Sequence, residues 1–374
     1  MRIIRISISL LSLLIILSCS QQLDERKYQI SRNVNLVNRD ASFNTTNLFF
    51  NLKNLAQSSI IFGHHHSTFY GIGWRGDEDR SDVKDVAGAH PGLIGWDFED
   101  FVKIGDEKYH NLRQMVIAAH EKGIVNAFCW HYSNPVTGGT FYDTTVVVNH
   151  LLPGGSHNGI YNKELDRIAN FTKQLVGTNG KVIPIIFRPF HEMDGNWFWW
   201  GRNFCTSEEF ILLWRYTVAY LKDYRKVKNV LFAFSPDRNF DSDGEYFTRY
   251  PGDEYVDILG VDNYWDFSRD GEGREAVKKK LKIITHIAAR KGKISAFTET
   301  GLERIPDNKW WTDKLLYAIS DDSIKISFVM VWRNVDKNHH YAPYKGHSSS
   351  PDFIEFKNNY NILFADNLPD LFAK

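Results

Sequence analysis

Two glutamates stand where a carboxyl group could do acid–base chemistry. Glu192 lies in the segment RPFHEMDG, residues 188–195, and Glu299 lies in FTETG, residues 297–301. Each comes at or just after the end of a short apolar run of the kind that forms a buried strand. A proton-donating carboxylic acid and a nucleophilic carboxylate are the pair that a retaining glycosidase requires. A lone Glu at a strand end more often pairs with a core Arg, so the interpretation depends on whether the two glutamates can face each other.

The elements that must position these glutamates alternate regularly along the chain. Short apolar runs predict strands, and stretches with apolar residues spaced by three and four predict helices. The predicted strands are Ser59–Gly63, Leu93–Asp97, Val125–Trp130, Val182–Phe187, Val230–Phe234, Asp257–Asp262, Ile294–Thr298 and Ile326–Val331. The predicted helices are Leu112–Glu121, Lys163–Leu175, Glu208–Tyr224, Glu275–Ala289, Thr312–Ile319 and Phe353–Tyr360, with little helical pattern between Asp237 and Tyr255. Alternating β and α units without a composition break predict a single (β/α)8 TIM barrel over residues 45–374, with long loops at its C-terminal face.

Such a barrel carries its active site at the C-terminal ends of its strands. Strands four and seven lie on opposite sides of the ring, so Glu192 and Glu299 would face each other across its mouth. The other polar and aromatic residues predicted to face the cleft are His64, His65, His66, Asp97, His131, Arg188, His191, Asp237, Asp262, Tyr264, Trp265, Trp332 and Arg333. Many of the 11 Trp fall at or just beyond strand C-termini, which favours stacking platforms for sugar rings: Trp96, Trp130, Trp197, Trp199, Trp200, Trp265 and Trp332. Packing alone is the alternative for Trp199 or Trp200.

The segment RPFHEMDGNWFWWG, residues 188–201, resembles the acid/base signature of glycoside hydrolase family 26. The segment FTETG is similar to the nucleophile segment of that family, and the resemblance covers about residues 45 to 365. It implies that Glu192 is the general acid/base and Glu299 the nucleophile of a retaining barrel enzyme. In most of the wider clan an Asn precedes the acid/base, whereas His191 is the family 26 variation.

The resemblance implies further substrate contacts. Trp197 would contact sugar near the scissile bond, and Tyr264 would hydrogen-bond the nucleophile and hold its orientation. Trp332 would be the platform under the sugar that distorts in the transition state. Other residues expected to bind substrate are His131, Arg188, His191, Asp262, Arg333, His65 and Trp96. No cofactor and no metal is expected.

Family 26 is dominated by β-1,4-mannanases, so the resemblance predicts cleavage of β-mannan or manno-oligosaccharides. Mannose differs from glucose at the axial 2-hydroxyl, and we hypothesise that His191 reaches that group. Three alternatives stay open: an exo-acting enzyme that releases mannobiose, a family member that cleaves β-1,3-xylan or mixed-linkage glucan, and a barrel that binds sugar without cleaving it. The intact pair of glutamates argues against the last. Long loops at 67–80, 133–158 and 334–350 could wall off one end of the cleft.

Three patterns that could bind metal ions are better explained in other ways. His191-Glu192 begins the zinc motif H-E-x-x-H, but Gly195 stands where the second His is required. Residues 64–66 are all His, and they cannot all converge on one ion because adjacent strand side chains point to opposite faces. Of these three, His65 is the one expected to line the cleft. The charged run from Asp77 to Asp85 is predicted to be a solvated loop and helix start rather than a calcium site.

Composition and the N-terminus bear on partners and location. Lys+Arg and Asp+Glu balance at 45 each in 374 residues, and no basic stretch with interleaved aromatics suggests nucleic acid. Arg2, Arg5 and the apolar stretch 6–17 are typical of a secretory signal, which ends in a lipobox-like ILSC. We expect a lipoprotein signal at 1–19 with lipid on Cys19, a polar tether at 20–44, and a monomer on the outer membrane that faces the periplasm, with the cell surface as the alternative. Whether Cys129 and Cys205 pair is open.

Overall fold

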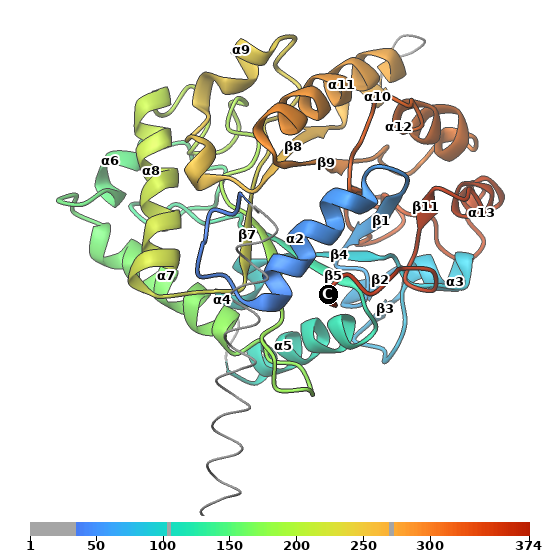
Figure 1. Ribbon diagram of the computed structural model, residues 1–374, viewed down its shortest axis with the longest axis horizontal. Helices are drawn as coiled ribbons and strands as arrows, with labels where there is room; N and C mark the ends of the chain where they lie inside the picture. Colours follow the sequence, from blue (N-terminus) through green and yellow to red (C-terminus); the bar gives the residue numbers. More distant parts are fainter. Residues whose placement is uncertain (1–34, 103–105, 269–272) are drawn as a thin grey trace, which may run out of the picture. The chain divides into compact units, whose positions relative to one another are not determined.

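The computed structural model describes residues 35–102, 106–268 and 273–374, and the unit from Leu36 to Lys374 is built around a closed parallel barrel (Figure 1). Eight strands follow one another in chain order around the ring, and the last pairs back with the first. They are β1 (Ile60–His65), β4 (Leu93–Asp97), β5 (Val125–Cys129), β6 (Ile185–Arg188), β7 (Val230–Phe234), β8 (Ile258–Asn263), β9 (Ile294–Thr300) and β10 (Phe328–Val331). The predicted (β/α)8 barrel is confirmed.

The eight barrel strands are buried along their whole length, which is why they appear in the sequence as continuous apolar runs. The bounds of β4 and β7 match the predicted ranges, whereas β9 runs two residues further, to Thr300. That extension places Glu299 within β9, just after a shift in the register of its pairing with β8 and β10. Two smaller pairings lie outside the ring: β11 (Ile362–Leu363) joins β1, and the hairpin of β2 (Tyr70–Gly71) and β3 (Trp74–Arg75) stands in the loop after β1.

Helices surround the strands, as the ribbon of Figure 1 shows. The longer ones are α2 (Phe43–Leu55), α5 (Asp106–Glu121), α7 (Asn158–Lys173), α8 (Ser207–Ala219), α11 (Gly273–Lys291) and α13 (Ser350–Lys357). The shorter ones are α3 (Asp82–Ala87), α4 (Phe98–Val102), α6 (Val148–Leu151), α9 (Asp243–Tyr246), α10 (Trp265–Ser268) and α12 (Tyr317–Ile319). Two π-helical turns (Tyr220–Tyr224 and Trp310–Leu316) and two 3-10 turns (Phe247–Arg249 and Asp253–Tyr255) complete the series.

The sequence signals at the start of α8 and in the connection from β7 to β8 both appear in the structure. Thr206 caps α8 by accepting from the backbone N–H of Glu209, whose side chain accepts in return from Thr206. The connection between β7 and β8 holds only α9 and the two 3-10 turns, in agreement with the weak helical pattern of the sequence between Asp237 and Tyr255.

The packed domain begins earlier than the predicted tether allows. The backbone N–H of Val37 donates to Asp257 (2.8 Å), and the side chain of Asn38 donates to the carbonyl of Val227 (2.8 Å). Helix α2 then starts at Phe43, after Ser42 as its cap. The boundary at residue 45 is therefore wrong by several residues, because residues 37–42 already form long-range hydrogen bonds to the segments just before β7 and β8. The rest of the predicted tether, residues 20–34, lies outside the described residues.

Candidate active site

Glu299 lies near the end of β9, buried between two donors. Arg188, the last residue of β6, donates to its Oε2, and the hydroxyl of Tyr264 donates to its Oε1 at 2.7 Å. The same guanidinium pairs with Asp262. Burial by itself would lower the pKa of Arg188, but the carboxylates of Asp262 and Glu299 raise it above its ordinary value. Both oxygens of the Glu299 carboxylate are therefore held by donors, one of them a permanently charged guanidinium.

Glu192 lies in a different environment, on the loop that follows β6. Its backbone N–H donates to the carbonyl of Ser235 (2.9 Å), and the indole N–H of Trp197 donates to its Oε2 (2.7 Å). Burial raises the pKa of Glu192 well above its usual range, and the nearby charges of Glu299 and Asp262 raise it further. This environment keeps the carboxyl protonated at a pH where an ordinary Glu is ionised, as a general acid requires.

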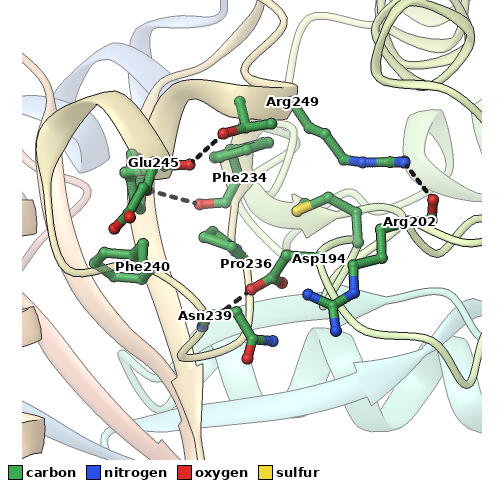
Figure 2. A pocket seen from close by; sticks show the side chains of 11 residues that line it. Asp194, Arg202, Phe234, Pro236, Asn239, Phe240, Glu245 and Arg249 are labelled. Atoms are coloured by element: carbon green, nitrogen blue, oxygen red, sulfur yellow. Dashed lines mark hydrogen bonds between the residues drawn. The ribbon is translucent and has the colours of Figure 1, made fainter.

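The loop that carries Glu192 is strained and anchored at several points. Glu192 has φ 55° and Phe190 has φ 49°, a left-handed conformation that non-glycine residues rarely adopt. The indole of Trp200 donates to the carbonyl of His191 (2.7 Å). The carboxylate of Asp194 accepts from two backbone N–H groups of the loop after β7, and Figure 2 draws the one from Asn239. These anchors hold the backbone in a conformation that local preference disfavours.

A second group of predicted residues lies at the ends of β10, β1 and β5. The ring of Trp332 is 4.3 Å from that of His65 and 5.6 Å from that of His131, and the guanidinium of Arg333 lies 5.3 Å from the Trp332 ring. Asp97, at the end of β4, accepts from His131 through Nδ1 (2.7 Å). That hydrogen bond sets the ring orientation and leaves Nε2 of His131 for another partner.

The chain was also compared with known protein families. The model of the glycosyl hydrolase family 26 matches residues 37–338, which is most of the chain. The chain belongs to glycosyl hydrolase family 26. The resemblance seen in the motif at 188–201 is thereby confirmed, and the match starts at residue 37, in agreement with the early start of the packed domain.

Individual family 26 relatives match over most of this chain. The mannan endo-1,4-beta-mannosidase of Bifidobacterium adolescentis is 35% identical over 360 residues, which cover 89% of this chain but 36% of the relative. This chain therefore spans about a third of the length of that relative, and 46% of a second one from Caldalkalibacillus mannanilyticus.

Two solved structures match more completely. GH26C from a Muricauda species shares 41% identity and a TM-score of 0.86, covering 90% of this chain and 96% of that one. A GH26 beta-mannanase from Bacteroides ovatus shares 40% identity and a TM-score of 0.84, covering 89% and 98%.

Several residues predicted to bind substrate are buried and already engaged by other groups. Asp262 is fully buried, and its carboxylate oxygens already accept from Arg188, Ser235 and Thr298. Arg188 is buried as well and is engaged with two carboxylates. His65 is buried beneath Trp332, where burial lowers its pKa well below the usual value, so the ring is neutral. These residues hold the groups that line the cleft, and a direct contact with sugar stays a prediction for them.

The predicted Trp platforms are wrong for four of the seven positions. Trp96 points away from the cleft, packs on Phe128 and donates to Asn126 (2.8 Å), because neighbouring strand residues alternate and Asp97 takes the inward direction. Trp130, Trp199 and Trp200 are also fully buried in the core. The accessible indoles are those of Trp197, Trp265 and Trp332.

His191 was predicted to reach the 2-hydroxyl of mannose, and the structure places it in a buried position. Its ring lies 4.6 Å from that of His131 and against Phe198. Its Nδ1 has no hydrogen-bond partner among the residues that the structure describes. Burial lowers the pKa of His191 well below the usual value, so the ring is neutral.

Sequence reasoning missed Ser235 and Asp194, and it placed Asp97 at the cleft without giving it a role. Asp97 orients His131, Ser235 anchors Glu192, and Asp194 ties the two loops together. Asp237 lies beside them, and burial together with the charge of Asp194 raises the pKa of Asp237 to about 7. Asp97 and Asp237 were predicted to face the cleft because both lie at or after the ends of apolar runs. Asp194 carried no such signal, because its partners lie on another strand's loop.

The two cysteines do not pair, and one of them lies in a cluster whose donor types could bind a metal ion. Cys129 and Cys205 are both free and buried. Asp97, Cys129 and His131 each offer one donor atom, all within 4.8 Å of one another. The His131–Asp97 hydrogen bond already accounts for two of these groups, and burial raises the pKa of the Cys129 thiol well above its usual value, which disfavours the thiolate that a metal needs.

The histidine run and the acidic run behave as the sequence predicts. His64 pairs with Ser67 (3.0 Å), and His66 pairs with Asp100 (2.7 Å), so the neighbours of His65 face other partners. In the acidic run, Asp77, Asp79 and Asp85 form ion pairs with Arg80, Lys84, His90 and Lys122. Asp82 is buried instead and accepts from the indole N–H of Trp74 (2.7 Å) and the side-chain amide of Asn334 (2.8 Å).

A hollow lies behind the Glu192 loop, and Figure 2 shows the side chains around it. Its walls come from the loop after β6, from β7 and from α9 with the turn that follows it. None of the residues predicted from the sequence to do chemistry lines it. The residues around it are Met193, Asp194, Arg202, Phe234, Pro236, Asn239, Phe240, Glu245, Tyr246, Thr248 and Arg249.

Proposed function

We propose that this protein is a retaining β-1,4-mannanase that uses Glu192 as general acid/base and Glu299 as nucleophile. The observation that carries the proposal is the contrast between the two carboxyl groups. Glu299 receives hydrogen bonds from a guanidinium and a phenol, whereas the pKa of Glu192 is raised by burial and by neighbouring carboxylates. A carboxylate held by donors and a carboxyl group with a raised pKa are the pair that double displacement requires.

In the first step, a carboxylate oxygen of Glu299 attacks the anomeric carbon while Glu192 gives its proton to the departing glycosidic oxygen. The product is a glycosyl ester on Glu299 and a free saccharide. In the second step, Glu192, now ionised, removes a proton from water, whose oxygen displaces Glu299 from the anomeric carbon. Glu192 is thereby protonated again and Glu299 is again a free carboxylate, and the configuration at the anomeric carbon is retained.

The proposed substrate rests on the relatives and on the imidazoles near Glu192. The relatives named above include mannan endo-1,4-beta-mannosidases and a beta-mannanase. His131 keeps Nε2 free of Asp97 and is positioned by it, so it can accept from a sugar hydroxyl. His191 packs behind it with an unsatisfied Nδ1. We propose that His131 contacts the sugar and that His191 supports it.

Release of mannobiose from chain ends is the second candidate. The observation that favours it is the β2–β3 hairpin, which stands in the loop after β1. Tyr70 of this hairpin hydrogen-bonds His66 (3.0 Å), and the guanidinium of Arg75 lies 4.8 Å from the ring of Phe69, so the hairpin is packed into place. A fixed wall beside Trp332 and Arg333 would limit how many sugar units extend past these two residues.

A product time course tests both candidates. Mannohexaose and polymeric mannan are each incubated with the enzyme and sampled from the first seconds onward. A ladder of oligosaccharide sizes means endo action, and mannobiose alone from the start means exo action. Release of sugar from β-1,3-xylan or mixed-linkage glucan but not from mannan would overturn the substrate. Tight binding of mannohexaose without any product would point to a non-catalytic sugar-binding protein.

We further propose that the protein is a monomeric lipoprotein anchored through Cys19 and placed in the outer membrane facing the periplasm. The lipobox-like ILSC supports the anchor, although Cys19 lies outside the described residues. Among the described residues, no helix has the length and apolar character to cross a membrane. Incorporation of labelled palmitate into the full chain, lost in Cys19→Ala, tests the anchor. Protease treatment of intact cells distinguishes the periplasmic face from the surface, and light scattering gives the oligomeric state.

A further inference from the structure

The rim above β7 and β8 carries an aromatic side chain and a cation that the proposed mechanism does not use. Trp265, the first residue of α10, leaves 59% of its surface exposed. The guanidinium of Arg238 lies 5.2 Å from the centroid of its indole ring. The Nε of Arg238 is buried, and no residue among those described accepts its hydrogen. A large exposed aromatic surface with an unsatisfied donor beside it is typical of a binding site.

The strand order places Trp265 and Arg238 beside the catalytic carboxyls and away from Trp332, His65 and His131. Glu192 follows β6 and Glu299 lies on β9, so a line between them divides the ring into two arcs. The longer arc, β10, β1, β4 and β5, carries Trp332, His65 and His131. The shorter arc is β7 and β8. A sugar chain that passes between the two glutamates therefore continues over the shorter arc on one side.

Both members of the pair are next to residues that act on the catalytic carboxyls. Tyr264, which precedes Trp265, donates to Glu299 at 2.7 Å. Asp237, which precedes Arg238, is close enough for its charge to act on Glu192. The pair thus lies at the edge of the reaction centre rather than on a remote surface.

Hydrogen bonds fix the backbone on both sides of the pair. The side chain of Asn263 donates to Asp266 (2.8 Å) and accepts from the backbone N–H of Asp266 (3.1 Å), which fixes the start of α10. Asp194 accepts from the N–H groups of Asp237 (2.6 Å) and Asn239 (3.1 Å), on either side of Arg238. A preorganised platform loses little freedom when a ligand binds, which favours affinity.

We propose that Trp265 and Arg238 form a subsite for the saccharide on the leaving-group side of the cleaved bond. A sugar ring stacks on the indole, and an N–H of Arg238 donates to a sugar hydroxyl. The inference rests on the proposed glycosidase function and deepens it. The same subsite would hold an acceptor in transglycosylation: the acceptor hydroxyl attacks the anomeric carbon of the glycosyl ester, Glu192 takes the hydroxyl proton, and Glu299 leaves as carboxylate.

The test compares a substrate that needs this subsite with one that bypasses it. In Trp265→Ala, kcat/KM on mannohexaose should fall at least about fivefold, the scale of one lost stacking contact. An aryl β-mannobioside, whose leaving group is an aryl ring directly at the bond, should lose less than about twofold in kcat/KM, since no sugar then occupies the subsite. The share of transglycosylation products at high oligosaccharide concentration should also fall. Arg238→Gln should show the same pattern with a smaller effect.

The control is Tyr360→Ala, which removes an aromatic ring that is 86% exposed in the loop after α13. It should leave both substrates at wild-type rates. Equal losses on both substrates in Trp265→Ala, or no loss on either, would overturn the subsite while leaving the proposed function intact. A wild-type protein that cleaves neither mannohexaose nor the aryl mannobioside would instead overturn the proposed function and the subsite with it.

Discussion

Glu299 and Glu192 carry the same functional group, but the chain holds them in opposite ways. Glu299 lies in the strand β9, where Arg188 and Tyr264 both donate to its carboxylate. Glu192 lies on a loop at φ 55°, and its raised pKa comes from burial and from neighbouring carboxylates. The difference teaches that the neighbours of a side chain, and not its identity, assign the roles of nucleophile and acid. Each prediction below changes one side of this comparison.

The largest effect is expected for Glu299→Ala. Removal of the nucleophile should lower kcat on every substrate by on the order of 10⁴-fold or more, since the covalent route is lost. The protein should still fold and bind mannohexaose, as measured by circular dichroism and calorimetry. Glu303→Ala, an exposed carboxylate shortly after β9, is the matched control and should keep its activity. Turnover that survives in Glu299→Ala would remove the nucleophile assignment.

Glu192→Ala should show a loss that depends on the leaving group. On mannohexaose the first step should slow by about 10²- to 10⁴-fold, the usual contribution of general acid catalysis. On an aryl β-mannobioside with an acidic phenol the first step should be nearly unchanged, because that leaving group needs little protonation. A pre-steady-state burst of phenol measures this step. Equal losses on the two substrates would contradict the acid assignment.

Tyr264→Phe removes one donor from Glu299 and keeps the ring. A hydrogen bond to a charged group contributes about 1.5–3 kcal/mol, so kcat should fall about 10- to 100-fold with little change in KM. The control is Tyr220→Phe, which removes a hydroxyl that donates to Asp166 on the outside of the barrel (2.8 Å). If Tyr264→Phe lowers affinity and leaves kcat unchanged, the hydroxyl serves the substrate rather than the nucleophile.

The smallest effect is expected for Trp197→Phe and concerns pH. The indole N–H of Trp197 favours ionised Glu192, so its removal should raise the pKa of Glu192 further. A general acid acts while protonated, and activity is lost as pH rises through its pKa. The alkaline limb of kcat/KM against pH should therefore move to higher pH. A shift of the alkaline limb to lower pH would contradict the role of this hydrogen bond.

The sequence was sufficient to predict the barrel and the positions of both glutamates, because both depend on patterns within short segments of the chain. Strands buried on both faces appear as apolar runs, and the barrel rule places Glu192 and Glu299 at the ends of β6 and β9. The motif at 188–201 added the family.

What the sequence could not supply are partnerships between distant residues. Arg188 lies in the acid/base motif but pairs with Asp262 and Glu299 on other strands. Trp96 ends a strand like a cleft residue, yet alternation turns it into the core. The start of the domain was missed for the same reason, since Val37 gains its place through Asp257.

The most direct test of the central claim is the configuration of the first product. Proton NMR follows the newly formed reducing end during the first minutes of mannohexaose cleavage, before mutarotation mixes the anomers. An ionised Glu299 that attacks the anomeric carbon and a protonated Glu192 that assists departure predict that the β-anomer forms first. Initial formation of the α-anomer would contradict the account, because water would then have displaced the leaving group directly.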